Sequence, residues 1–197
     1  MPIYTKVGDK GFTVLPRAGK ASLRVRKDDP RLAALGEVDE LNAVLGLCVT
    51  EARRRRRNAI AAWVIEVQEN LLVVGANLAA GTGGYVASVA LDASAIVRME
   101  QDIDALTCDM PELANFLLPG GCELAARLHL ARTVARRAER AVVGTLRPAV
   151  GSRTATRADV ILRYLNRLSD FLFTLARTAN HQAKTAETVW QGAGRKG

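Results

Sequence analysis

Aromatic residues are scarce in this chain of 197 residues, at 5% of the total, although apolar residues make up 49%. Its hydrophobic core must therefore consist mostly of alanine, leucine and valine. Such a composition favours closely packed helices over a sheet, in which branched and aromatic side chains are preferred. It argues against a mainly β architecture, and the length fits one domain with a core of its own.

Cysteine and histidine are also rare. The three cysteines, Cys48, Cys108 and Cys122, are odd in number and show no CxxC spacing. Neither a disulfide framework nor a zinc site is expected, and a reducing compartment is favoured. The two histidines, His129 and His181, have no partner at metal-ligand spacing, so we interpret them as structural or surface residues. No metal site built from the protein alone is predicted.

Signals for targeting or membrane insertion are weak. The first residues, MPIYTKVGDKG, lack the apolar stretch of a signal peptide and the arginine-rich pattern of a transit peptide. Residues 70–91 carry no charge, but Asn70, Asn77 and the glycine-rich residues 81–84 interrupt them, so a spanning helix is not expected. The sequence favours a soluble, cytoplasmic protein without a membrane partner.

Basic residues outnumber acidic ones, with 28 Lys and Arg against 20 Asp and Glu and a formal net charge of +8. This excess indicates an anionic partner, and charge alone does not choose among nucleic acid, a lipid surface and a phosphorylated small molecule. The arginine run at 53–57 lies at a predicted helix end, where cations are favoured. No aromatic platform or nucleic-acid-binding motif accompanies it.

Hydrophobic residues recur at steps of three and four in five segments, which predicts five helices. The clearest pattern is Ile60, Val64, Val67, Leu71, Val74 and Leu78. The expected helices span about residues 31–56, 60–78, 92–108, 123–144 and 157–183. Asp29-Pro30 is typical of a helix start, and the glycines at 81–84 of a helix end. Short connections favour an all-α antiparallel bundle.

The expected domain is single and covers residues 1–197. Residues 1–29 are polar and punctuated by glycine, which predicts an ordered loop or a short hairpin. The bundle occupies residues 30–183, and residues 184–197 form a tail.

The fourth predicted helix is rich in arginine, in the stretch ARTVARRAER at 131–140. Arg132, Arg136, Glu139 and Arg140 are spaced so that they lie along one stripe. The stripe is either a solvated face on which Glu139 braces the arginines, or a clamp for polyphosphate, because guanidinium groups match phosphate oxygens in pairs. The residues alone leave both interpretations open.

A similar stripe on the fifth predicted helix contains Asn166, Asp170, Phe173 and Arg177. An asparagine deep in a leucine-rich helix is costly unless it is paired. Taken alone, Asn166 is best explained as a residue that fixes the packing register.

The N-terminal stretch YTKVGDKGFT combines glycines with hydrogen-bond donors. Gly8 and Gly11 allow backbone N–H groups to turn inward, and Lys6, Lys10 and Thr13 add donors, an arrangement that suits an anion. It is not a Walker motif, because GxxxxGK[ST] is absent. A tight turn is the simpler explanation of this stretch by itself.

Five segments together resemble one family, the trimeric helical-bundle ATP:cob(I)alamin adenosyltransferases. In the family's order they are YTKVGDKGFT, RVRKDDPR, LGEVDELNAVLG, FLLPGGCELAARLHLARTVARRAER and YLNRLSDFLFTLAR. They span nearly the whole of residues 3–180, and five in order are specific where one is not. The resemblance implies that cobalt(I) of reduced cobalamin attacks the 5′ carbon of ATP and expels triphosphate, with Mg²⁺ held mostly by the phosphates.

The resemblance also implies roles for individual residues. Those expected to wrap ATP from the N-terminal region are Thr5, Lys6, Val7, Gly8, Thr13 and Lys27. Those expected to complete its site are Arg136, Arg137, Glu139, Arg140 and Asn166. Arg132 would pair with Asp39 of an adjacent subunit in a homotrimer. Phe116 would press on the lower face of the cobalt and exclude an axial ligand, whereas by position alone it is a hydrophobic staple at a helix start.

Three positions depart from the family pattern: Val7 where many members have threonine, Leu35 for a frequent tyrosine, and Cys122 for a small hydroxyl residue. Val7 favours one alternative, a module that holds ATP or adenosylcobalamin for delivery or sensing without turnover. A nucleic-acid binder based on residues 53–57 ranks lower and is not expected. A cobalamin reductase or a cobalamin-dependent enzyme is a further partner that the resemblance suggests.

Overall fold

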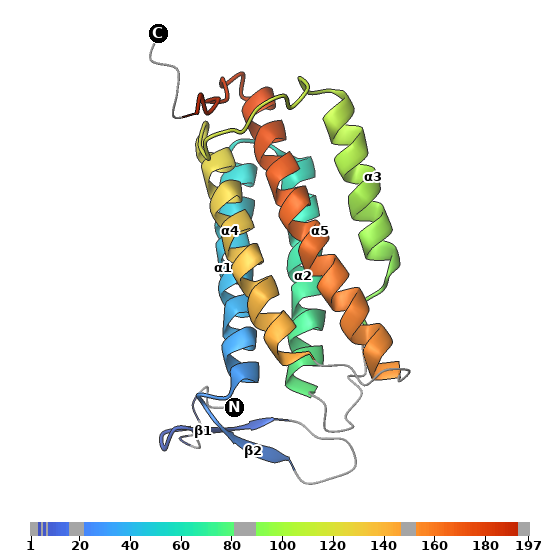
Figure 1. Ribbon diagram of the computed structural model, residues 1–197. Coiled ribbons are helices and arrows are strands. Elements are labelled where there is room, and N and C mark those ends of the chain that lie inside the picture. Colours follow the sequence, from blue (N-terminus) through green and yellow to red (C-terminus); the bar gives the residue numbers. More distant parts are fainter. Residues whose placement is uncertain are drawn as a thin grey trace.

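Residues 4, 6, 8–15, 22–80, 90–146 and 153–192 are described by the computed structural model. A two-stranded hairpin precedes five helices (Figure 1). The elements are β1 Phe12–Leu15, β2 Leu23–Arg26, α1 Pro30–Arg54, α2 Asn58–Ala80, α3 Ser94–Cys108, α4 Glu123–Thr145 and α5 Arg153–Gln182. The predicted all-α bundle is confirmed, and its largest boundary difference is the start of α5, at Arg153 rather than 157.

Local signals explain some of the helix ends. Asp29 caps α1 by accepting a hydrogen bond from the Arg31 amide at 2.9 Å, with Pro30 in the first turn. Glu123 opens α4 as expected, but this helix continues to Thr145. The helix that was expected to end at residue 144 thus ends one residue later, and Gly144 lies inside its last turn. The expected glycine terminator of α2, at 81–84, lies outside the described residues.

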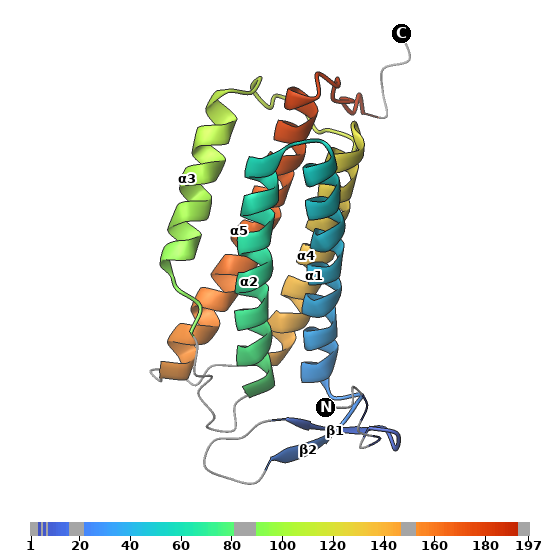
Figure 2. The same ribbon diagram turned by 180° about the vertical axis from the view of Figure 1, so that it is seen from behind.

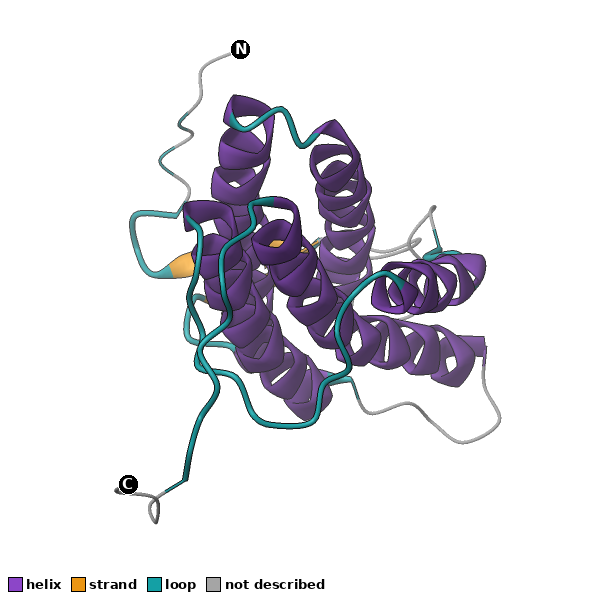
Figure 3. Ribbon diagram, turned by 90° about the horizontal axis from the view of Figure 1, so that it is seen from above, coloured by secondary structure: helices purple, strands orange, loops and turns teal. Residues whose placement is uncertain are grey.

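The helices alternate in direction along the bundle (Figures 1 and 2). α1 packs against α2 and α4, and α4 also packs against α5. These contacting pairs are antiparallel, as predicted. The outer helix α3 packs on α5 and runs parallel to it, because the long connection from α3 returns the chain to the start of α4. Figure 3 views the end of the bundle that this connection crosses.

The core is aliphatic, as the low aromatic content predicted. Tyr164 and Phe171 are its only fully buried aromatic residues within the described parts of the chain. The α4 residues Ala131, Ala135 and Ala138 are all 0% exposed, so their small side chains let neighbouring helices approach closely.

Among the described helices, only α2 is long and apolar enough to cross a bilayer by length and composition, with a mean hydropathy of 1.4. Core helices of globular proteins share these properties. In α2 the buried side chains include every position of the predicted three-and-four pattern, from Ile60 to Leu78. These side chains pack into the common hydrophobic core of the bundle.

The N-terminal region contains the expected short hairpin. β1 and β2 pair in antiparallel register, with Thr13 opposite Val25. Gly11 precedes β1 with a φ of 75°, a conformation that glycine adopts readily. The hairpin lies beneath the first turn of α1, at the end of the bundle where α4 finishes (Figure 1).

Candidate functional site

The arginine-rich stretch of α4 divides between two faces of the helix. Arg137 faces α1, where the carboxylates of Glu37 and Glu40 accept hydrogen bonds from its guanidinium group. Those two contacts also pair its charge. The stripe predicted from Arg132 to Arg140 lies on the side toward α5.

The stripes on α4 and α5 meet through a side-chain pair. Asn166 Nδ2 donates a hydrogen bond to Glu139 Oε1 at 2.9 Å. Asn166 is exposed, so the expectation of an asparagine deep in the helix interior is wrong, and no large desolvation cost has to be offset. Its side chain lies at the surface beside Glu139.

Among the described residues, the arginines of the stripe have no acidic partner. Arg140 Nη1 donates to the backbone carbonyl of Arg136 at 3.0 Å. Glu139 bonds to Asn166 and to none of the described arginines, so the bracing expected for a plain solvated face is not found. Within the described residues, the exposed guanidinium group of Arg136 has no ion-pair partner. The geometry therefore favours the polyphosphate clamp over the solvated face.

Arg132 also has no acidic partner among the described residues, and its side chain is partly buried. Its Nε atom is buried and makes no hydrogen bond with the described residues. Burial lowers the pKa of Arg132, and the like charge of Arg136 lowers it further. Two guanidinium groups that repel each other without a local carboxylate form a site that an anion would stabilise.

His129 lies one turn before Arg132 and is buried, as the structural interpretation predicted. Its ring centroid is 5.9 Å from that of Phe173 on α5. Burial lowers the pKa of His129, and Arg132 adds to this effect, so the neutral imidazole is favoured. His129 is thus a packing residue that adds no further cation to the site.

The N-terminal region brings three expected ATP ligands together. The Lys27 ammonium lies against Gly8: a β-carbon on Gly8 would be 3.2 Å from Lys27 Nζ. The Lys27 amide also donates to the Gly11 carbonyl at 2.9 Å, and Thr13 lies in the adjoining strand. Lys6 places its ammonium 5.9 Å from the ring centroid of Tyr4.

Two expected ATP ligands of this region, Thr5 and Val7, lie outside the described residues.

Phe116 is 79% exposed, so the interpretation of this residue as a buried hydrophobic staple is wrong. Its ring meets Trp190 edge-on, with centroids 6.2 Å apart. Both residues line an open cavity of about 490 Å³, together with residues 113–115 and 191–192. Sequence analysis missed Trp190, because nothing in the tail sequence signals that it folds back onto the bundle.

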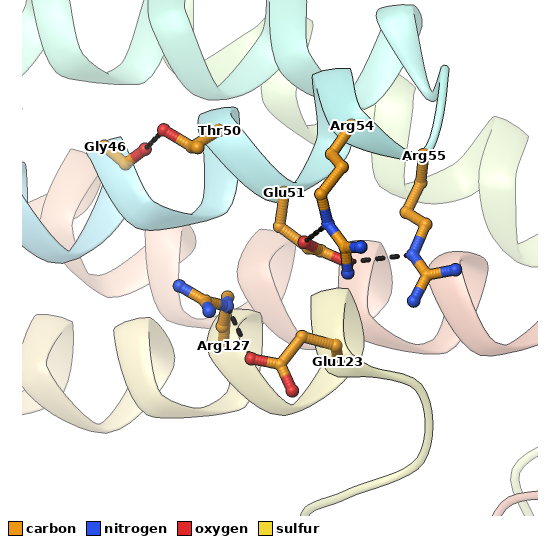
Figure 4. Close-up of polar contacts among 7 residues, drawn as sticks. All are labelled: Gly46, Thr50, Glu51, Arg54, Arg55, Glu123 and Arg127. Atoms are coloured by element: carbon orange, nitrogen blue, oxygen red, sulfur yellow. Dashed lines mark hydrogen bonds and ion pairs between the residues drawn. The ribbon is translucent and has the colours of Figure 1, made fainter.

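Arginines of the run at 53–57 make hydrogen bonds near the end of α1. The buried carboxylate of Glu51 accepts hydrogen bonds from Nε of Arg54 at 2.6 Å and of Arg55 at 2.9 Å (Figure 4). Arg57 donates to a backbone carbonyl at the end of α5, at 2.7 Å. These contacts give Arg54, Arg55 and Arg57 a structural role and weaken the nucleic-acid interpretation, whereas Arg53 and Arg56 are exposed.

The expected site residues occupy three separate places in one chain. Arg136 lies thirteen residues after the start of α4, which is about 20 Å along the helix from the end that carries Phe116. The hairpin with Lys27 lies below the opposite end of the bundle (Figure 1). Asp39 on α1 is exposed and makes no contact with Arg132 of the same chain among the described interactions.

These features define a helical-bundle protein with an apolar cavity at one end and, between α4 and α5, a cationic surface without an acidic partner in the described part of the chain. The chain belongs to the cobalamin adenosyltransferase family, whose profile matches residues 3–179. The corrinoid adenosyltransferase of Bacillus subtilis is 36% identical over 192 residues, which cover 97% of this chain and 93% of the relative. The cobalamin adenosyltransferase of Cupriavidus metallidurans is 39% identical over 96% and 94% of the two chains.

Solved structures agree with this assignment. A variant PduO-type ATP:corrinoid adenosyltransferase from Lactobacillus reuteri, complexed with cobalamin and ATP, has a TM-score of 0.84 and 33% identity over 97% of this chain and 100% of that one. Another variant of that enzyme, complexed with ATP, has a TM-score of 0.82 and 35% identity over 96% and 100% of the chains. This chain spans about half the length of two longer PduO relatives, 51% in Citrobacter freundii and 53% in Salmonella typhimurium.

Proposed function

We propose that this protein is an ATP:corrinoid adenosyltransferase in which the α4 arginines bind the triphosphate of ATP. It transfers the 5′-deoxyadenosyl group to the cobalt of cob(I)alamin and releases triphosphate. The observation that carries the proposal is the exposed guanidinium group of Arg136, beside the partly buried Arg132, without an acidic partner among the described residues. Family membership supplies the reaction to which this surface is assigned.

The chemistry suits a site that has no activated protein nucleophile. Cobalt(I) supplies the electron pair of the new cobalt–carbon bond, and the C5′–O bond breaks with its pair moving to triphosphate. The protein must align the reactants and stabilise the charge of the leaving group. Hydrogen bonds to charged groups contribute about 1.5–3 kcal/mol each, so two or three guanidinium groups would have a large effect on the rate.

Arg136 and Arg140 lie on the exposed stripe and would hold the phosphates. The paired side chains of Glu139 and Asn166 would bind the hydroxyl and amine groups of the nucleoside, for which they offer acceptors and a donor. Arg137 differs from the other arginines, because two carboxylates already pair its charge. We assign Arg137 to holding α4 against α1, so that its effect on ATP is indirect.

The separation of the expected residues supports a site between subunits. A single chain places Phe116, the arginine stripe and the hairpin at different levels of the bundle, and Asp39 is exposed without a described partner. In a homotrimer, Asp39 of one subunit would pair with Arg132 of the next. The hairpin residues Lys6, Gly8, Thr13 and Lys27, together with Thr5 and Val7, would then cover ATP.

Mg²⁺ would enter with ATP. The described residues contain no cluster of three potential ligands from His, Cys, Asp and Glu. Those assigned to ATP are mainly cationic groups, which suit phosphate oxygens better than a cation. The phosphates would therefore provide most of the ligands to Mg²⁺.

Phe116 would act on the corrin. Its ring is exposed at the apolar cavity, and it would pack against the lower face of the corrin and exclude an axial ligand from the cobalt. Loss of that ligand makes reduction of cobalt(II) easier, and a separate reductase would supply the electron. A cytoplasmic location is supported by the three free cysteines.

The test is to mix the protein with chemically reduced cobalamin and Mg-ATP and to follow the corrinoid absorbance. The proposal predicts formation of adenosylcobalamin and of one triphosphate for each product. Bound nucleotide without a cobalt–carbon product would leave only the non-catalytic binding module. Light scattering on the same sample tests the homotrimer, which predicts a mass three times the 21.2 kDa of one chain.

A further inference from the structure

The loop that carries Phe116 is fastened to the last turns of α5. Arg177 Nη2 donates to the carbonyl of Pro111 at 2.8 Å, near the start of this loop. Asn180 holds its other end, donating to the Gly120 carbonyl at 3.1 Å and accepting from the Cys122 amide at 2.9 Å. Arg177 and Asn180 are 5% and 2% exposed, so the anchors are part of the interior.

A C-terminal segment, residues 185–192, adds a second restraint on the same loop. The Leu118 amide donates to the Thr188 carbonyl at 2.8 Å, and the Trp190 amide donates to the Phe116 carbonyl at 2.8 Å. Together these bonds form a short antiparallel bridge. The bridge places the Trp190 ring edge-on to Phe116, so one wall of the apolar cavity belongs to the C-terminal segment.

Arg177 connects the two restraints. Its Nε atom lies 3.2 Å and 3.3 Å from the two carboxylate oxygens of Glu187, at the start of the bridge, while its Nη2 atom bonds to Pro111. Glu187 is the only acidic partner of this buried guanidinium group among the described residues. Loss of the carboxylate would leave a buried charge uncompensated, so the Arg177–Glu187 pair favours the docked C-terminal segment.

We propose that Arg177 and Glu187 are positioning residues for Phe116, which they reach through the C-terminal segment and the loop. Neither residue touches the reacting atoms. They hold Trp190 beside Phe116 and keep the exposed ring of Phe116 in one orientation, which its own few contacts do not ensure. The inference rests on the proposed function for the claim that this orientation matters to the cobalt, but the docking itself is independent of any substrate.

The first experiment needs no substrate and compares hydrogen exchange in the free protein. Glu187→Gln is expected to increase exchange at the Leu118 and Trp190 amides at least tenfold, because these amides donate the two bridging bonds. The matched control is Glu112→Gln, which removes the same charge from an exposed position in the same loop. Equal exchange at both amides in wild type and Glu187→Gln would overturn the proposal.

The second experiment measures turnover from two starting states. Glu187→Gln is expected to slow the reaction from cob(II)alamin with a reductant at least fivefold more than the reaction from preformed cob(I)alamin. In a Phe116→Ala background, the same substitution should cause no further loss, since both changes act through one ring. Equal slowing of both starting states, or effects that multiply in the double variant, would contradict a role through Phe116.

The result that would refute the proposed function differs from the result that would refute the docking of the C-terminal segment. A wild-type protein that forms no adenosylcobalamin would refute the proposed function, while the exchange of the two amides would still test the docking.

Discussion

Gly121 lies directly against the side-chain amide of Asn180. A β-carbon on Gly121 would be 2.1 Å from Asn180 Oδ1, and Gly121 has a φ of 106°. Both the contact and the backbone conformation therefore require glycine at this position. The Pro119-Gly120-Gly121 turn thus fits α4 onto the end of α5 and also fixes one end of the Phe116 loop.

Gly121→Ala is expected to destabilise the fold by about 2 kcal/mol or more, because it combines a strained backbone with displacement of the buried Asn180 amide. Urea denaturation followed by circular dichroism measures the change. Gly144→Ala is the matched control: Gly144 is helical, has an ordinary φ, and has no atoms within 4 Å of the added β-carbon. It should be neutral or stabilising, and a similar loss in both variants would contradict the explanation.

Phe116→Ala should slow adenosylation much more from cob(II)alamin under a reductant than from preformed cob(I)alamin. Removal of the ring lets an axial ligand approach the cobalt, and this mainly affects its reduction. The ring is exposed, so the melting temperature should change little. Stopped-flow absorbance from the two starting states checks the prediction, and equal slowing in both would exclude the axial role.

The charge of Glu51 should make the stability of the fold depend on pH. The hydrogen bond from Arg54, with a further contribution from Arg55, lowers the pKa of Glu51 from 4.5 to about 2 against the opposing effect of burial. A lowered folded-state pKa stabilises the fold above pH 4.5, and this stabilisation is lost as the pH falls from 4.5 toward 2. Glu51→Gln should therefore cost about 1–2 kcal/mol at pH 7.

The same comparison at acid pH tests the predicted direction of this pH dependence. The difference in unfolding free energy between wild type and Glu51→Gln should shrink steadily between pH 4.5 and pH 2.5. A difference that stayed constant over this range, or grew, would show that the Glu51 charge does not stabilise the end of α1.

Cysteine labelling provides an independent check of the core. Burial raises the pKa of Cys48 to about 12, whereas Cys108 is exposed at the end of α3. At pH 8, iodoacetamide should label Cys108 within minutes and leave Cys48 unmodified until the protein is unfolded. Peptide mass spectrometry identifies the labelled residue, and early labelling of Cys48 would contradict its position in the packed core.

Much of the fold could be predicted because bundle helices repeat their burial every three or four residues. The predicted α2 positions from Ile60 to Leu78 are all buried, and the alanines of α4 form a closely packed seam. Spacing also identified the face of α4 that meets α5 through Glu139 and Asn166. Spacing did not show that the side chain of Asn166 is exposed, because exposure depends on side-chain orientation.

Contacts between distant segments could not be predicted from local pattern. Arg137 pairs with Glu37 and Glu40, about a hundred positions away, and only the register between α1 and α4 brings them together. The two carboxylates, three residues apart on α1, were a visible signal without a known partner. The bridge between Trp190 and Phe116 depends on where α5 ends, so the tail sequence alone gave no indication of it.

The central claim is that the α4 arginines bind the triphosphate of ATP. The most direct measurement is turnover with preformed cob(I)alamin and Mg-ATP for wild type, Arg136→Ala and the control Arg163→Ala. Arg163 is exposed, and its Nη1 atom lies 3.9 Å from Asp159 Oδ2. Loss of about 2–4 kcal/mol of transition-state stabilisation predicts a decrease in kcat/KM of about thirtyfold to a thousandfold for Arg136→Ala with the helical fold retained, and little change in the control. Wild-type kcat/KM in a folded Arg136→Ala variant would contradict the account.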